Sequence, residues 1–201
     1  MHWLERREFD EARRIAKNVS EQVSYKYGEL VPTADIMKIV ENMTGIDAKF
    51  TELDFGLLKD VDGNTGAFDN YGAAMYVSEE QNKTVARIIL NSRENPKKQR
   101  FSLVHELGHL ALENMNEGDG YLFSAHIDMD LTSISDADLD ADPTLVDEQA
   151  ANIFALMVLM PDDVFRTALK RNDSLDDIAQ LFGVTKDAVL SRIMLGYKKE
   201  A

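Results

Sequence analysis

The chain of 201 residues has the size of one compact domain with at most a small appendage, and its 44% hydrophobic residues are enough to build a core. It contains no cysteine, which excludes disulfide scaffolds, thiolate zinc fingers, iron–sulfur clusters and cysteine nucleophiles. The formal net charge is −14. Residues 101–165 hold 14 acidic residues and no Lys or Arg, so this stretch repels nucleic acid and attracts cations or basic partners.

The start of the chain and its longest apolar run predict no export signal and no membrane span. Met1–Arg7 carries charges that no apolar run follows. Ile153–Met160 is apolar over 8 residues, whereas a membrane-spanning helix needs about 20. We therefore expect a cytoplasmic protein without membrane contact.

The N-terminal segment predicts two helices. Apolar residues recur at intervals of three and four over Phe9–Tyr27, which indicates an amphipathic helix closed by Gly28. A second helix follows, with Thr33 suited to cap its start and Gly45 suited to the position after its end.

The middle of the chain predicts three short strands, near residues 48–53, 73–78 and 84–91. Residues 62–66 indicate a turn region, and residues 79–83 form the connection between the last two strands. Successive strands joined by short turns favour an antiparallel sheet.

Two further helices are predicted on either side of an irregular segment. After a loop over residues 92–99, residues 100–112 carry apolar side chains around nearly the whole helical circumference, which predicts a buried helix. Residues 114–144 are acidic and rich in Gly, Ser and Asp, and we expect no regular structure there. A helix then begins near Leu145 and is stopped by Pro161.

The buried helix carries the sequence His-Glu-x-x-His at residues 105–109. Side chains four residues apart lie on one helix face, so His105 and His109 can bind the same metal ion. Glu106 points beside that ion, which suits the general base of a metal-dependent hydrolase. Gly108 is unfavourable inside a helix and predicts the close approach of another backbone.

A catalytic zinc site needs a third protein ligand and leaves one position for water. Glu148 and His126 are the two candidates from the residues alone. Glu148 is favoured because a helix holds a ligand more rigidly than the acidic segment around His126. Asn152, one turn further on, can hydrogen-bond to a ligand. The donor set suits Zn²⁺, and it also accepts Mn²⁺, Fe²⁺ or Co²⁺.

Residues 100–110 (RFSLVHELGHL), 148–155 (EQAANIFA) and 159–161 (LMP) resemble the ImmA/IrrE metallopeptidases. The likeness extends over about residues 60–196. It implies that Glu148, in the pattern Glu-x-x-Ala-Asn, is the third zinc ligand and that Glu106 is catalytic. It also implies an α+β, zincin-like fold: a small antiparallel sheet flanked by helices over residues 1–165, and a helix-turn-helix-like appendage over residues 166–201.

The resemblance implies a zinc-dependent endopeptidase that cleaves a helix-turn-helix repressor and thereby releases phage, mobile-element or stress genes. In this hypothesis Glu106 takes a proton from water and later protonates the leaving amine. Tyr71 and Tyr121 are weak candidates for stabilising the oxyanion. The protein substrate is expected to lie along an exposed sheet edge.

Two other patterns leave alternatives open. Asp136, Asp138, Asp140, Asp142 and Asp147 follow a calcium-loop spacing, but Ala141 occupies the position that needs Gly, so a solvated acidic segment is favoured. Such acids could also concentrate a basic substrate near the metal.

Residues 174–193 have the outline of a helix-turn-helix, with Ser174 and Thr185 as caps and Gly183 in the turn. Only Lys186 and Arg192 offer positive charge on the second helix, so direct nucleic-acid binding is disfavoured and a packing or docking role is favoured. The alternatives to peptidase function are a catalytically silent binding partner or antitoxin, and a DNA-binding regulator that uses these helices.

Overall fold

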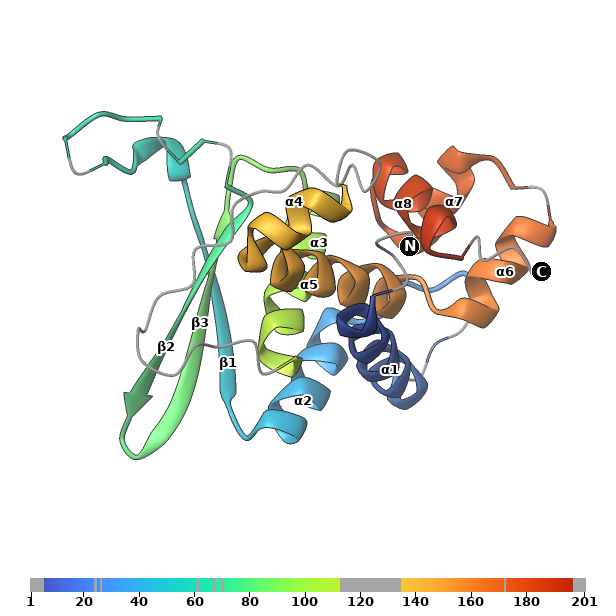
Figure 1. The fold of residues 1–201 in the computed structure, drawn as a ribbon, viewed down its shortest axis with the longest axis horizontal. Helices are drawn as coiled ribbons and strands as arrows, with labels where there is room; N and C mark the ends of the chain where they lie inside the picture. The colour runs from blue at the N-terminus through green and yellow to red at the C-terminus, as the bar shows by residue number, and fades with distance from the viewer. Residues whose placement is uncertain are drawn as a thin grey trace.

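The computed structural model describes residues 6–196 except 24, 26, 61, 67, 70, 113–134 and 172. A three-stranded sheet lies at one end, and helices fill the rest of the molecule (Figure 1). In chain order the elements are α1 (Arg7–Gln22), α2 (Thr33–Thr44), β1 (Asp47–Leu53), the 3-10 turn η2 (Phe55–Leu57), β2 (Ala73–Glu80), β3 (Lys83–Asn91), α3 (Pro96–Ala111), α4 (Asp136–Ala141), α5 (Pro143–Leu159), α6 (Asp162–Lys170), α7 (Leu175–Phe182) and α8 (Lys186–Gly196).

The predicted strands are present, but the expectation of a purely antiparallel sheet was wrong. The strand order is β1-β3-β2, with β1 parallel to β3 and β2 antiparallel to β3. Strands β2 and β3 form the predicted hairpin, whose turn residues Gln81 and Asn82 both have positive φ. The long connection over residues 54–72 allows β2 to lie one strand position away from β1, and β3 occupies the position between them. The short turn therefore determines the antiparallel pairing of β2 with β3, whereas tertiary packing determines the parallel pairing of β1 with β3.

The first helix is shorter than predicted and the second starts differently. Helix α1 ends at Gln22, and Val23 is already extended. The next described residue, Tyr25, stacks on Phe182 at a centroid distance of 6.3 Å, so tertiary packing redirects the chain before Gly28. Thr33 lies inside α2 and makes no capping bond, whereas Gly45 adopts the left-handed conformation predicted at the C-terminal end.

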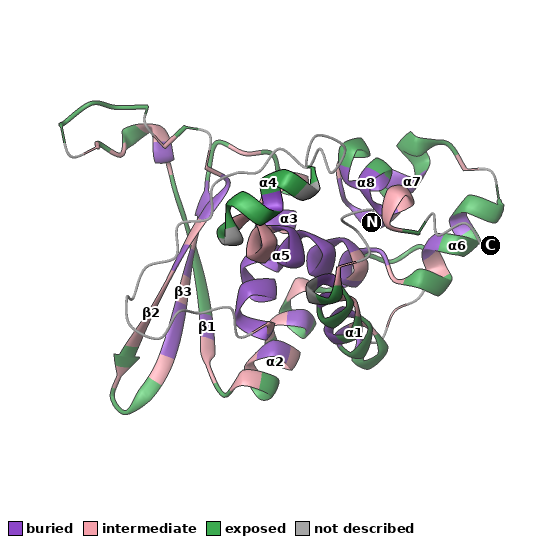
Figure 2. Ribbon diagram, viewed as in Figure 1, coloured by how far each residue is buried: buried purple, intermediate pink, exposed green. Residues whose placement is uncertain are grey.

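Helices α3 and α5 form the centre of the molecule and are buried over most of their length (Figure 2). Helix α3 begins at Pro96, earlier than predicted, because the Asn95 side chain accepts hydrogen bonds from the next backbone N–H groups. The expected close approach at Gly108 is confirmed. A Cβ there would lie 3.2 Å from the carbonyl oxygen of Ala151 on α5.

The acidic segment before α5 is more regular than expected where it is described. Helix α4 spans Asp136–Ala141 and begins with a capping box in which Ser135 and Asp138 bond reciprocally. Because these positions are helical and Asp142 caps α5, the calcium-loop spacing does not form a loop. This agrees with the favoured interpretation of solvated acids.

The two predicted C-terminal helices are present as α7 and α8, at the end of the molecule opposite the sheet (Figure 1). Ser174 caps α7, the Thr185 hydroxyl accepts from the N–H of Ala188, and Gly183 is left-handed in the turn. Apolar residues of α6–α8 belong to the same buried cluster as α3 and α5. In the described part of the chain, no helix combines the length and apolar character needed to cross a bilayer.

Candidate metal centre

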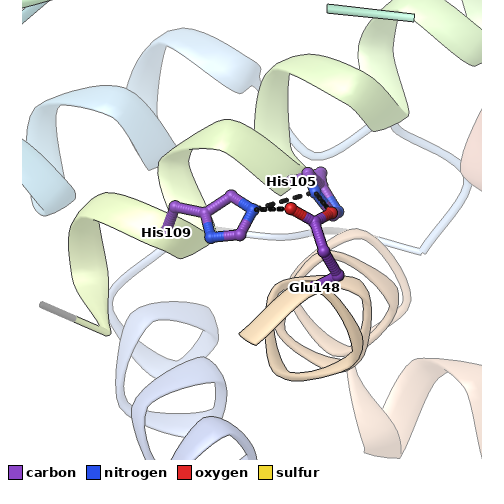
Figure 3. Close-up of side chains that lie close together, drawn as sticks. All are labelled: His105, His109 and Glu148. Carbon is purple, nitrogen blue, oxygen red and sulfur yellow. Dashed lines mark hydrogen bonds and ion pairs between the residues drawn. The ribbon is translucent and has the colours of Figure 1, made fainter. Parts of the chain in front are cut away.

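The predicted metal-site residues lie on two helices that cross in the core. His105 and His109 project from one face of α3, and Glu148 faces them from α5 (Figure 3). His105 is 6% exposed and His109 is 1% exposed. The close backbone contact at Gly108 brings α5 near enough for the Glu148 carboxylate to reach both rings.

The ligand atoms converge on one point. The Nε2 atoms of His105 and His109 lie 3.1 Å apart. The carboxylate of Glu148 places Oε2 3.1 Å from His105 Nε2 and Oε1 3.4 Å from His109 Nε2. One ligand atom from each residue can therefore be chosen so that all three lie within 4.8 Å of one another.

Asn152 orients the first ring. Its Oδ1 lies 2.9 Å from His105 Nδ1. An amide oxygen can only accept, so Nδ1 donates and carries a hydrogen. In the neutral ring the lone pair is then on Nε2, which faces His109 and Glu148. Asn152 therefore lies beside His105, one of the residues that the sequence predicts to bind a metal.

Charges around the centre favour ionised groups despite burial. Burial alone would raise the pKa of Glu148, but hydrogen bonds and charge from His105 and His109 outweigh it and lower this pKa to about 2. Burial alone would lower the pKa of His105. The hydrogen bond and charge of Glu148, the charge of Glu106 and the bond to Asn152 outweigh that effect, so the pKa of His105 is raised.

This donor set fits a divalent cation. When both rings carry hydrogen on Nδ1, two Nε2 lone pairs face each other beside a carboxylate, and the three groups have no hydrogen to share. A metal ion accepts all three lone pairs, and two imidazoles with one carboxylate are a common ligand set of catalytic zinc. Among the described residues, His105, His109 and Glu148 form a group of three side chains whose ligand atoms lie close enough together to hold one metal ion.

The other predicted residues are distributed unevenly around the centre. Glu106 follows His105 on α3 and is 0% exposed. The Tyr71 ring contacts Phe68 at a centroid distance of 5.8 Å, and the backbone carbonyl of Tyr71 accepts a hydrogen bond from Asn91 Nδ2. His126 and Tyr121 lie outside the described residues.

Asp147 is a residue near the centre that the sequence assigned only to the calcium spacing. Burial and the charge of Glu148 raise its pKa, while the charge of His109 opposes them. Asp147 therefore lies close enough to His109 and Glu148 for their charges to affect its ionisation. Its position next to Glu148 was the signal that could have identified it.

The helix-turn-helix-like pair presents little free positive charge. Lys186 pairs with Asp176 at 2.8 Å. Arg192 is 3% exposed, donates to the carbonyl of Met160 and pairs with Asp162. Both cations that the sequence offers on α8 therefore have partners within the protein.

Comparison with known proteins identifies the family. Residues 68–194 match the model of peptidase family M78, described as the IrrE N-terminal-like domain. The chain belongs to this family. The matched range contains the histidines of α3 and the Glu148 and Asn152 positions of α5, so the predicted resemblance is confirmed.

A curated relative and a solved structure give the same picture of the fold. The chain is 29% identical over 161 residues to the radiation response metalloprotease IrrE of Deinococcus radiodurans. The matched region covers 80% of this chain and 39% of that relative. The chain also resembles the structure of a Mycobacterium tuberculosis transcriptional regulator with a TM-score of 0.53 and 15% identity, covering 95% of this chain and 48% of that one. The chain thus spans less than half the length of either protein. The α+β, zincin-like fold with its C-terminal helices is confirmed, with a mixed sheet.

Proposed function

We propose that this protein is a zinc-dependent endopeptidase in which His105, His109 and Glu148 hold the metal. The single observation that carries the proposal is the convergence of these three side chains from α3 and α5. The family and the similarity to a metalloprotease support the same class of activity.

The residues around the centre suit peptide hydrolysis. Two imidazoles and one carboxylate would hold a divalent ion, which when bound would supply Lewis acidity and lower the pKa of a bound water to near neutral pH. Glu106, buried beside His105, accepts the proton of the attacking water and passes it to the leaving nitrogen. Asn152, whose Oδ1 contacts His105 Nδ1, would leave His105 Nε2 free to bind the ion. The charges that keep Glu148 ionised maintain its ability to bind a cation.

We further propose that the substrate is a helix-turn-helix repressor, whose DNA-binding surface is basic. The excess of acids in residues 101–165 supports this substrate class. Asp138 on α4 is exposed a short distance along the chain from Glu148, whereas Asp140 pairs with Arg6. No Lys or Arg occurs between residues 101 and 165. A negative field around the cleavage site raises the local concentration of a basic substrate and is weakened by salt.

The decisive experiment combines metal analysis with a cleavage assay. The purified protein is expected to contain about one equivalent of zinc and to cleave one repressor among those encoded by neighbouring genes, with a rate that falls as salt is raised. The Glu106→Gln variant is the matched control, because it is expected to keep the metal and lose cleavage. Cleavage by Glu106→Gln at the wild-type rate would refute the assignment.

The other functions give different outcomes in the same experiment. A silent binding partner or antitoxin would form a stable complex with the repressor without bound metal and without cleavage. A DNA-binding regulator would bind a specific DNA sequence after chelation of all metal. The internal ion pairs of Lys186 and Arg192 oppose this last outcome.

A further inference from the structure

Gly108 on α3 lies against the backbone of Ala151 on α5, in the middle of the metal centre. Along α3, Gly108 stands between the two histidines of the centre. Along α5, Ala151 stands between Glu148 and Asn152, the two residues that reach those histidines. The separation of the two helices at this contact therefore sets how far the side chains of α5 stand from the imidazole rings.

The contact leaves no room for a side chain at position 108. A Cβ there would lie 3.2 Å from the carbonyl oxygen and 3.3 Å from the Cα of Ala151, and 3.0 Å from Cδ1 of Phe154. The Phe154 ring can turn aside, whereas backbone atoms of α5 move only when the helix moves. A methyl group at position 108 would therefore push α5 away from α3 by a few tenths of an ångström.

The present separation gives the ligand atoms the spacing that a zinc-sized ion needs. Zinc bonds of about 2.0–2.1 Å in a tetrahedron place neighbouring ligand atoms about 3.3–3.4 Å apart. The Nε2 atoms of His105 and His109 lie 3.1 Å apart, and the Glu148 oxygens lie 3.1 and 3.4 Å from them. A larger ion with the same coordination would need wider spacing, because its bonds are longer.

We propose that Gly108 is a specificity-determining residue of the metal centre, because its missing side chain holds α5 at the distance that selects Zn²⁺ over a larger ion. Glu148 and Asn152 lie on either side of Ala151, so separation of the helices lengthens the contacts of both residues together. Rotation of one side chain cannot restore both contacts. The inference rests on the proposed metal-dependent function.

The test replaces Gly108 with Ala and compares Zn²⁺ with Cd²⁺. Both ions have a filled d shell and no geometric preference from d electrons, and Cd²⁺ is larger. Their dissociation constants are measured on the full chain by competition with a chromophoric chelator. Groups that orient metal ligands contribute a factor of about 10–100 to affinity, so we expect Gly108→Ala to weaken zinc binding about 10-fold and cadmium binding less than about 3-fold. General loss of folding would weaken both ions equally.

The matched control is Gly196→Ala at the end of α8. A Cβ there has Arg192 Nη1 at 3.9 Å as its nearest described atom, which is an ordinary contact. This variant is expected to leave both dissociation constants unchanged. Alanine is also the better helix former, so lost helix propensity cannot explain weaker binding in Gly108→Ala. An unchanged ratio of the zinc and cadmium constants in Gly108→Ala would overturn the inference.

The double variant Gly108→Ala/Phe154→Leu separates the backbone contact from the ring contact. Leucine removes the ring at position 154 and leaves the contact with the Ala151 backbone, so the ratio is expected to stay shifted. Return of the ratio to its wild-type value would overturn helix separation as the cause.

The wild-type protein gives a test that needs no substitution. It is expected to bind zinc at least about 10-fold more tightly than cadmium. Equal affinity for the two ions would overturn the selection of zinc by ion size. Failure of the wild-type protein to bind zinc at all would instead contradict the proposed function.

Discussion

Two helix pairs of this protein carry sequence motifs, and the polar side chains of the two motifs differ in their partners. On α3 and α5, ligand atoms of two buried histidines and the partly buried Glu148 lie within 4.8 Å of one another. On α7 and α8, Lys186 and Arg192 turn to acids of the same protein. The first arrangement directs three possible ligand atoms at one point, where a cation could bind. In the second, both cations are paired with acids of the same protein.

The strongest test of the first helix pair removes its proposed general base. Glu106→Gln is expected to lower kcat about 10²–10⁴-fold, the usual contribution of general acid–base catalysis, because an amide cannot take the proton of the attacking water. Zinc content is expected to stay near one equivalent. Steady-state cleavage of the repressor and metal analysis of the same sample check both statements. Loss of zinc in this variant would instead give Glu106 a role in binding.

Removal of the metal tests whether the ion is bound by the α3–α5 pair. A ligand that binds only the folded state stabilises it by about 4 kcal/mol at 1,000 times its dissociation constant. Chelation should therefore lower the Tm of the wild-type protein substantially and leave that of His109→Ala nearly unchanged. Thermal unfolding with and without chelator measures this difference. Equal shifts in both proteins would place the metal elsewhere.

Arg192 tests the second helix pair. Its guanidinium lies 5.0 Å from the centroid of the Phe165 ring, donates to Met160 and pairs with Asp162. Arg192→Met should lower the free energy of unfolding by about 1–3 kcal/mol, because the Met160 carbonyl loses its donor. Zinc content should not change.

Lys186→Met is the control for Arg192→Met. The Lys186–Asp176 pair is exposed, and such pairs contribute less than about 1 kcal/mol. Denaturant unfolding compares the two variants. Equal stability of both would contradict the anchoring role of Arg192.

The pH dependence of zinc stabilisation gives the smallest expected effect. In the metal-free protein, the raised pKa of His105 contributes stability below about 6.5, the usual histidine value, and this contribution is lost as pH rises through the higher folded value. The lowered pKa of Glu148 contributes stability above 4.5 that is lost as pH falls toward about 2. The His105–Glu148 ion pair therefore stabilises the metal-free protein most between pH 4.5 and about pH 6.5.

Zinc and protons compete for the same imidazoles. The increase in Tm on adding zinc should therefore be smaller at pH ~6 than at pH ~8. Differential scanning fluorimetry across this range measures it. If the increase in Tm on adding zinc does not vary with pH, zinc does not compete with protons for His105.

The sequence by itself determined features that depend on neighbours along the chain. The spacing of His105 and His109 puts both rings on one helix face because an α-helix repeats every 3.6 residues. Gly45 ends α2 and Gly183 forms the turn after α7, since glycine adopts the left-handed conformation at no steric cost. The backbone contact predicted at Gly108 is also present.

Only the tertiary structure decided features that join distant segments. Glu148 meets His105 across 43 residues of chain, β3 lies between β1 and β2, and Arg192 is buried against Met160. Each depends on how whole helices and strands pack, and local hydrogen bonds and residue spacing do not specify that packing. The same physical difference explains why the parallel strand pair and the early end of α1 were not predicted, whereas the two histidines could be read directly from the sequence.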